Sequence, residues 1–137
     1  MEYTKENMLE LIIIRGLPGT GKSTRAKKDY PNYLHYETDH LFCDTQGRYR
    51  FDAQLWTIAM NWLSAIVDIA LAKKECVVVS DVFATKESYQ RFIDLANAHG
   101  ANVKIITCKE CYGNTHRVPV FIMDKMRSEF EEIDAEE

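Results

Sequence analysis

The sequence has no apolar run that approaches a membrane span, which needs about 20 consecutive apolar residues. The aliphatic run Leu11–Ile14, for example, holds only four. The first residues, 1–6, also lack the pattern of a secretory signal peptide. We therefore expect the chain to lie in the cytosol and to have no membrane partner.

Cysteines are few, at four in the whole chain, and a cytosolic location argues against disulfide bonds. Cys108 and Cys111 have the C-x-x-C spacing of half a zinc site or of a redox pair. A zinc site would need two more ligands, and the fold would have to bring His116 and Cys43 close to supply them. The favoured interpretation is two free thiols near a strand end. Half a zinc site and a redox pair stay open as alternatives.

A strongly basic stripe is absent as well. The formal net charge is -4, but six of the 21 acidic residues lie in the last nine positions, 129–137. The rest of the chain therefore holds 15 acidic residues against 17 basic ones. This balance neither favours nor excludes a polyanionic partner. The acidic end is interpreted as a solvated helix end, with contact to a protein partner as the alternative.

The chain also lacks internal repeats, linkers and low-complexity runs apart from this acidic end. Its 137 residues are long enough to bury a substantial core, and 46% of them are hydrophobic, which excludes disorder as the default. We expect one domain that spans residues 1–137.

One stretch of the sequence points to a specific chemistry. Gly16, Gly21, Lys22 and Ser23 have the spacing G-x-x-x-x-G-K-S of the phosphate-binding P-loop. An apolar run precedes it, and a helix-compatible segment follows it, as a phosphate site at a helix N-terminus requires. The glycines let backbone N–H groups turn toward phosphate oxygens, and Lys22 is expected to reach the outer phosphates.

This loop predicts a site for ATP and Mg²⁺, in which the Ser23 hydroxyl holds the metal. The residues expected to bind the nucleotide are Gly16, Leu17, Pro18, Gly19, Thr20, Gly21, Lys22, Ser23 and Thr24.

Apolar runs alternate with segments of helical periodicity, which predicts an α/β fold. The strands are expected at 9–15, 32–37, 76–81 and 102–107, and the helices at 22–29, 53–74, 86–98 and 120–132. Strands that alternate with helices imply right-handed βαβ units and a parallel sheet covered on both faces. The predicted fold is a three-layer P-loop NTPase sandwich of about four strands in the order 2-3-1-4, the pattern of P-loop kinases.

Ligands bind at the carboxyl ends of such strands, so acidic residues that follow a strand are candidates for catalysis. Asp39 follows the second strand and is the candidate general base for an attacking hydroxyl. Asp81 follows the valine-rich third strand, as a Walker-B aspartate does, and would hold Mg²⁺ through water or orient the acceptor. Both are also typical of turns and helix caps.

These motifs together resemble a known family. They are R-G-L-P-G-T-G-K-S-T at 15–24, Asp39, V-V-V-S-D at 77–81, Gly47-x-Tyr49-x-Phe51 and Asn114-x-His116-x-Val118-Pro119. Over about residues 10–130 the chain resembles the ATP-binding family that includes the 5′-hydroxyl kinase domain of phage polynucleotide kinases. The resemblance implies that Lys22 and Ser23 bind ATP and Mg²⁺, that Asp39 is the base and that Asp81 belongs to the acceptor side. If a phage encodes the chain, its location is the cytosol of the host cell.

Two positions depart from that family. Its members carry an arginine three residues after the base aspartate, where this chain has Phe42, and a lid arginine before the asparagine, where it has Gly113. Arg117 is the candidate replacement for the lid arginine and is counted with the catalytic residues. The other basic residues considered for the mouth are Arg15, Arg48, Arg50 and Arg127, each of which is more commonly a solvated surface residue.

Three functions are consistent with these observations. The first is an ATP-dependent kinase that transfers the γ-phosphate to a hydroxyl acceptor, with a nucleic-acid 5′-hydroxyl among the candidates. The second is a nucleotide-binding module that does not turn over and acts through a protein partner, which the two missing arginines favour. The third is a nucleoside or nucleotide kinase, which usually needs more arginines than this chain offers.

Overall fold

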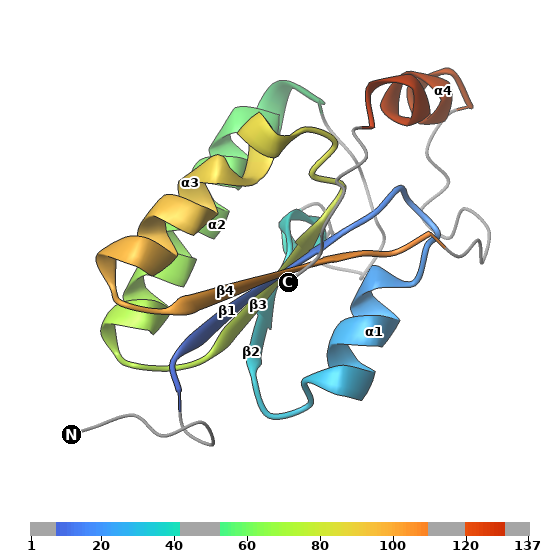
Figure 1. The fold of residues 1–137 in the computed structure, drawn as a ribbon. Helices are drawn as coiled ribbons and strands as arrows, with labels where there is room; N and C mark the ends of the chain where they lie inside the picture. The colour runs from blue at the N-terminus through green and yellow to red at the C-terminus, as the bar shows by residue number, and fades with distance from the viewer. Residues whose placement is uncertain (1–7, 42–52, 110–119, 131–137) are drawn as a thin grey trace.

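The computed structural model describes residues 8–41, 53–109 and 120–130 of the chain (Figure 1). The elements of the first half are β1 Glu10–Arg15, α1 Lys22–Asp29, β2 Leu34–Tyr36, the short 3-10 helices η1 Thr38–His40 and η2 Ala53–Leu55, and α2 Trp56–Ala72. Those of the second half are β3 Val77–Asp81, α3 Lys86–Ala98, β4 Asn102–Thr107 and α4 Val120–Glu129. All of the predicted strands and helices are therefore present, with shifts of a few residues at their ends.

The four strands form one parallel sheet in the order β2-β3-β1-β4, which confirms the predicted topology. β1 lies in the interior of the sheet, where Leu11 pairs with Val77 on one side and with Val103 on the other. β2 is an edge strand whose partner is β3, and it pairs with β3 through Leu34, His35 and Tyr36. It is shorter than the predicted 32–37, because Pro31 and the turn that follows it delay the start of pairing.

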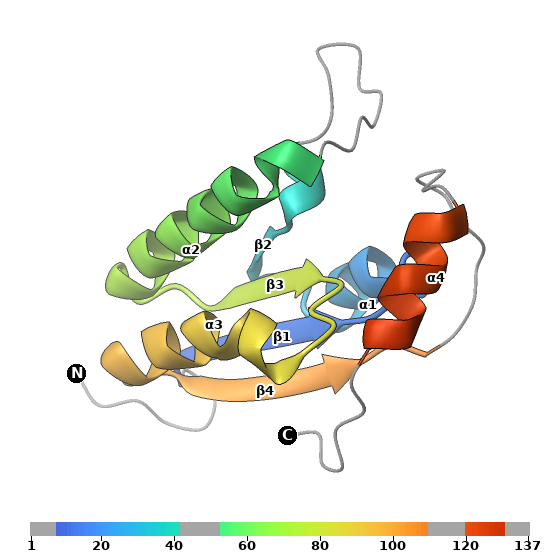
Figure 2. The same cartoon turned by 90° about the horizontal axis from the view of Figure 1, so that it is seen from above.

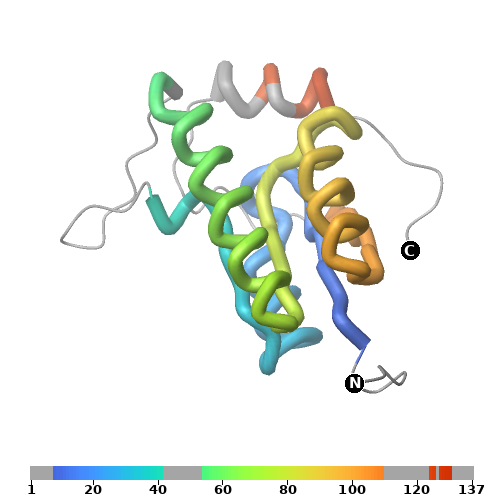
Figure 3. Tube along the Cα trace, turned by 90° about the vertical axis from the view of Figure 1, so that its left-hand side faces the viewer, coloured from blue at the N-terminus to red at the C-terminus, as the bar shows by residue number. Residues whose placement is uncertain are grey.

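Helices cover both faces of the sheet, so the three-layer prediction is also confirmed. α2 and α3 lie side by side on one face, and α1 covers the other (Figures 1 and 3). Alternate residues of β1 serve the two sides: Leu11 and Ile13 pack toward α2 and α3, whereas Ile12 and Ile14 pack toward α1.

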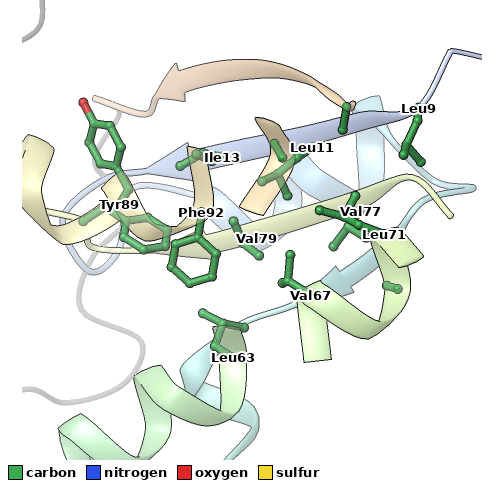
Figure 4. Packing of buried hydrophobic residues seen from close by; sticks show 14 of the residues in the cluster. Leu9, Leu11, Ile13, Leu63, Val67, Leu71, Val77, Val79, Tyr89 and Phe92 are labelled. Atoms are coloured by element: carbon green, nitrogen blue, oxygen red, sulfur yellow. The ribbon is translucent and has the colours of Figure 1, made fainter. Parts of the chain in front are cut away.

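The larger core lies between the sheet and the pair α2 and α3 (Figure 4). Its side chains are almost fully buried, and Leu63, Val67 and Phe92 from the helices show no exposed surface. The core on the α1 side is smaller and contains few helix residues, with Ala26 fully enclosed. The first turn of α1 lies at the edge of the sheet, next to the P-loop.

The carboxyl ends of the strands gather at one edge of the sheet, and α4 lies close to that edge (Figure 2). The P-loop, η1 and the loop after β3 all begin there. α2 begins and ends inside its predicted range 53–74, and Lys74 ends it with a left-handed φ of 63°. In the described part of the chain, no helix is both long and apolar enough to cross a membrane.

Candidate nucleotide-binding site

The P-loop joins β1 to α1 and ends at the first turn of the helix. Gly19 and Gly21 adopt left-handed φ values of 82° and 80°, which glycine accepts at little cost. Thr20 stabilises the loop, since its hydroxyl donates to the Leu17 carbonyl oxygen at 2.6 Å. Gly21 is the N-cap of α1 and has no side chain to cap the first turn. The N–H groups at this helix end thus suit an anion.

Gly16 is required for a different reason, which is space. A methyl group at this position would lie 2.9 Å from the carbonyl oxygen of Cys108 and would also press on the Thr20 hydroxyl. The backbone of Gly16 also donates to the Val82 carbonyl oxygen at 3.2 Å. The start of the loop is therefore wedged between the ends of β3 and β4.

Lys22 folds back over the loop, and its Nζ donates to the Leu17 carbonyl oxygen at 3.1 Å. Burial lowers the pKa of this ammonium. The negative charges of Asp81, Asp39 and Glu37, in that order, oppose the effect. Lys22 therefore lies among the carboxylates at the ends of β2 and β3.

Ser23 contacts Glu37, a carboxylate that is not among the residues predicted for the site. Its Oγ donates to Oε2 of Glu37 at 2.7 Å, and Oγ of Ser80 donates to the same oxygen at 2.8 Å. His35 supports the arrangement, with Nε2 at 2.6 Å from the Ser80 Oγ and at 3.5 Å from Oε2. We call Ser23, His35, Glu37 and Ser80 the Glu37 cluster.

The Glu37 cluster keeps its carboxylate charged. Burial alone would raise the pKa of Glu37, but the hydrogen bonds from His35, Ser23 and Ser80 outweigh burial and lower the pKa to about 2. The other carboxylate oxygen, Oε1, lies 3.7 Å from Nε2 of His40, whose side chain is 45% exposed. The cluster thus presents an anion beside the P-loop hydroxyl.

Asp81 is almost fully buried, and its partners are on η1 rather than on the P-loop. Its Oδ2 accepts from the backbone N and the Oγ1 of Thr38 at 3.2 and 2.5 Å, and its Oδ1 accepts from Val82 N at 3.0 Å. Burial raises the pKa of Asp81 to about 6, and the charge of Asp39 adds to this effect, against the hydrogen bonds from Thr38. These contacts connect Asp81 to η1 and to its own backbone neighbour, Val82.

Asp39 lies half-buried in η1, directly after β2. Backbone hydrogen bonds from His40 N to Glu37 O at 3.2 Å and from Leu41 N to Thr38 O at 2.9 Å hold this turn. Its charge acts on both Lys22 and Asp81. The structure therefore brings Lys22, Asp39 and Asp81 to one edge of the sheet.

Arg15 is not a surface residue at the mouth of the site, which corrects that expectation. Its side chain is fully buried, and its guanidinium donates to the carbonyl oxygens of Phe83 and Ala84 and to the Thr107 hydroxyl. The ring of Phe130, just after α4, lies 4.1 Å from the guanidinium carbon. Arg15 thus binds the end of β1 to the ends of β3 and β4 and to the chain that follows α4. Arg127, in contrast, is exposed and pairs with Asp124.

Several predicted residues lie outside the described ranges. They are Arg117, Phe42, Gly113, Arg48, Arg50, Asn114, His116, Cys43 and Cys111. Cys108 is described, and it is buried at the end of β4 with its carbonyl against Gly16. Among residues 8–41, 53–109 and 120–130, no three His, Cys, Asp or Glu side chains are grouped to hold a metal ion.

Residues 11–110 match the protein family described as AAA domain. The chain belongs to this family of P-loop proteins. A curated relative, the uncharacterized protein PM0531 of Pasteurella multocida, is 24% identical over 135 residues, which cover 87% of this chain and 75% of the relative.

Solved structures with a P-loop kinase fold superpose on the chain. A chain of the Pnkp1/Rnl/Hen1 complex has a TM-score of 0.60 at 18% identity, and the match covers 90% of this chain but only 40% of that one. A gluconokinase from Sinorhizobium meliloti 1021 has a TM-score of 0.59 at 19% identity, with 90% and 75% covered. Kti12 of Chaetomium thermophilum, in complex with ADP-AlF3, has a TM-score of 0.63 at 17% identity, with 89% and 80% covered. At these low identities, the TM-scores establish a P-loop kinase-like fold.

Proposed function

We propose that the chain is a kinase that binds ATP with Mg²⁺ at the P-loop and transfers the γ-phosphate to a hydroxyl acceptor. One observation carries the proposal: Lys22 and Ser23 of the P-loop lie next to the acidic residues that end β2 and β3. Phosphoryl transfer needs this combination of phosphate binding, metal binding and a base.

The residues at 16–24 would hold the phosphates through backbone N–H groups, and Lys22 would neutralise charge on the outer ones. The oxygen donors here fit Mg²⁺, because this ion takes oxygen ligands and usually binds through one or two protein groups plus substrate phosphates. Ser23 would be the protein ligand from the P-loop. When bound, the metal would offset the charge that develops on the phosphate oxygens.

Asp39 would act as the general base. Its carboxylate accepts the proton of the acceptor hydroxyl while that oxygen forms a bond to the γ-phosphorus. The bond from the γ-phosphorus to the bridging oxygen breaks, so that ADP leaves with the electron pair. The charge of Asp39 acts to raise the pKa of Lys22, so the two side chains lie near each other. This proximity supports a common site for donor and acceptor.

A nucleic-acid 5′-hydroxyl is the acceptor that we test first. The support is the likeness of the fold to a chain of the Pnkp1/Rnl/Hen1 complex, which is described as an RNA repair complex. A smaller hydroxyl is the next candidate, because the fold is equally similar to a gluconokinase. Nucleosides and nucleoside monophosphates complete the set.

The second candidate function is nucleotide binding without turnover, through a protein partner. Phe42 and Gly113 favour it, because polynucleotide kinases are expected to carry arginines at these two positions. An arginine that stabilises transition-state charge contributes about 10³-fold or more to the rate.

Transfer of radiolabelled γ-phosphate distinguishes the candidates. The acceptors are 5′-hydroxyl RNA and DNA oligonucleotides, gluconate and a nucleoside panel. Asp39→Asn should lower transfer by about 10²-fold or more and leave ATP affinity nearly unchanged, since a base contributes that much to the rate. Asp94→Asn, at an exposed site on α3, is the matched control.

Transfer at the wild-type rate by Asp39→Asn would show that the base is another group. Tight ATP binding by calorimetry without transfer to any acceptor would favour the binding module over the kinase.

A further inference from the structure

The structure suggests a different acidic partner for Ser23 in metal binding than the sequence does. In P-loop proteins the metal is held by the P-loop hydroxyl together with an acidic residue after a strand. Metal binding through water is one of the two roles that the sequence predicts for Asp81. The hydroxyl of Ser23 instead donates to Glu37, which directly follows β2, at 2.7 Å.

This hydrogen bond is compatible with metal binding at the same hydroxyl. A serine hydroxyl has one hydrogen to donate and two lone pairs to offer. Donation to Glu37 uses the hydrogen and leaves the lone pairs for a cation. It also polarises the O–H bond, so the oxygen becomes a better ligand.

The Glu37 carboxylate is held in place by several donors. Ser80 donates to the same Oε2, and Nε2 of His35 lies 2.6 Å from the Ser80 hydroxyl. Oε1 lies 3.7 Å from Nε2 of the half-exposed His40. Hydrogen-bond donors thus fix the carboxylate through Oε2, whereas Oε1 lies on the His40 side of the Glu37 cluster.

The pleat of β3 explains why Asp81 does not reach Ser23. Alternate strand residues face opposite sides of a sheet. Val77 and Val79 pack in the core on the α2 and α3 side, and Asp81 has the same parity. Val78 packs on the α1 side, and Ser80 shares its parity and donates to Glu37 within the Glu37 cluster.

Asp81 uses both of its oxygens elsewhere. Thr38 donates to it twice and Val82 once. Thr38 begins η1, the turn that carries Asp39. Asp81 therefore acts on the site by holding η1.

We propose that Glu37 and Ser23 together form the protein part of the metal site, and that Asp81 is a positioning residue for Asp39. The proposal rests on the proposed binding of ATP with a divalent metal. In this division, Glu37 after β2 supplies the charge that faces the metal. Asp81 at the end of β3 supports the acceptor side by holding η1.

Binding measurements with Mn²⁺ and ATP test this division. Mn²⁺ affinity of the protein–ATP complex is measured by electron paramagnetic resonance, and ATP affinity in EDTA is measured by calorimetry. Glu37→Gln should weaken Mn²⁺ binding by about 10-fold or more, as for groups that orient metal ligands. Its ATP affinity in EDTA should not fall, because the change removes a negative charge near the phosphates. Asp81→Asn should keep Mn²⁺ affinity within about threefold of wild type, since its partners are on η1.

Two further variants complete the comparison. Glu75→Gln, an exposed site before β3, is the matched control and should behave as wild type. Ser80→Ala removes one donor to Glu37 and should weaken Mn²⁺ binding several-fold, which keeps the test valid if Glu37→Gln does not fold.

An unchanged Mn²⁺ affinity in both Glu37→Gln and Ser80→Ala would overturn the proposal. A loss in Asp81→Asn as large as in Glu37→Gln would overturn the division of roles. Phosphate transfer is measured in parallel, so a wild-type chain that binds Mn²⁺ and ATP without transfer would refute the kinase function and leave the Glu37 result valid.

Discussion

Replacing Arg15 by methionine should destabilise the protein far more than replacing an exposed arginine. The Arg15 side chain is 0% exposed and donates to Phe83 O at 3.0 Å, to Ala84 O at 3.2 Å and to Thr107 Oγ1 at 3.2 Å. Methionine fills much of the same volume but donates no hydrogen bond. The substitution therefore tests the hydrogen bonds and the charge with little change in packing.

The expected loss of unfolding free energy follows from the hydrogen-bond acceptors that lose Arg15 as their donor. A buried acceptor that loses its donor costs about 1–3 kcal/mol, and two carbonyl oxygens are affected here. The attraction between the guanidinium and the Phe130 ring adds about 0.5–2 kcal/mol. Removal of a buried charge offsets part of the loss, since its desolvation costs several kcal/mol. We expect the free energy of unfolding to fall by about 2–4 kcal/mol, a large part of the 5–15 kcal/mol that is typical of a domain.

Urea unfolding followed by circular dichroism measures this free energy. Arg127→Met is the control, because Arg127 is 60% exposed and pairs with Asp124 at the surface. Exposed pairs contribute about 0–1 kcal/mol, so the control should change little. A value for Arg15→Met within about 0.5 kcal/mol of wild type, at an unchanged denaturant slope, would refute the role assigned to Arg15.

Three further predictions concern stability and binding. Burial raises the pKa of Asp81 from 3.8 to about 6, so folding favours its protonated form, and the stability this gives is present below pH 3.8 and lost as the pH rises through 6. Asp81→Asn should remove this loss, so its unfolding free energy relative to wild type should rise by about 2 kcal/mol from pH 4 to pH 7, and a constant difference would contradict the assignment. Thr85→Ala should cost about 1 kcal/mol in thermal or urea unfolding, since Thr85 accepts from Ser88 N at the start of α3, whereas Thr85→Ser should retain the cap. Gly16→Ala should weaken ATP binding in calorimetry, because its methyl group would lie 2.9 Å from the Cys108 carbonyl oxygen; wild-type affinity would show that the loop moves freely.

The arrangement of strands was predictable because the chain marks its elements clearly. Leu11–Ile14 is apolar without interruption, as a strand covered on both faces must be. Pro31 excludes further helix after α1, which ends at Asp29, and Gly100 takes a left-handed φ of 70° after α3. The ends of β2 were less predictable, because an edge strand with one partner pairs over a length that depends on its neighbour.

The location of the site was also predictable, but its contacts were not. The rule that ligands bind at the carboxyl ends of parallel strands selected Asp39 and Asp81 correctly as residues of that edge. It does not say which side of the sheet each side chain takes. Glu37 lies within the predicted strand 32–37, and the rule gives no role to residues inside a strand.

The missing information was present in the alternation of β2. Leu34 and Tyr36 pack against the core on the α2 side, with Tyr36 edge-on to Trp62. The polar residues His35 and Glu37 alternate with them and must face α1, which carries Ser23. A strand whose polar face looks toward the P-loop helix is thus a sequence signal for a residue that contacts the P-loop hydroxyl.

The same alternation accounts for Arg15. Leu11 and Ile13 point to the core on the α2 and α3 side, so residue 15 has the parity of that core. An arginine at this position cannot reach the phosphates on the P-loop side without leaving its strand register. It can be buried only if backbone acceptors surround it, and the loop from β3 to α3 supplies two of them. Side-chain parity at the strand ends therefore separates charges that face α1 and the P-loop hydroxyl from charges that hold the edge of the sheet together.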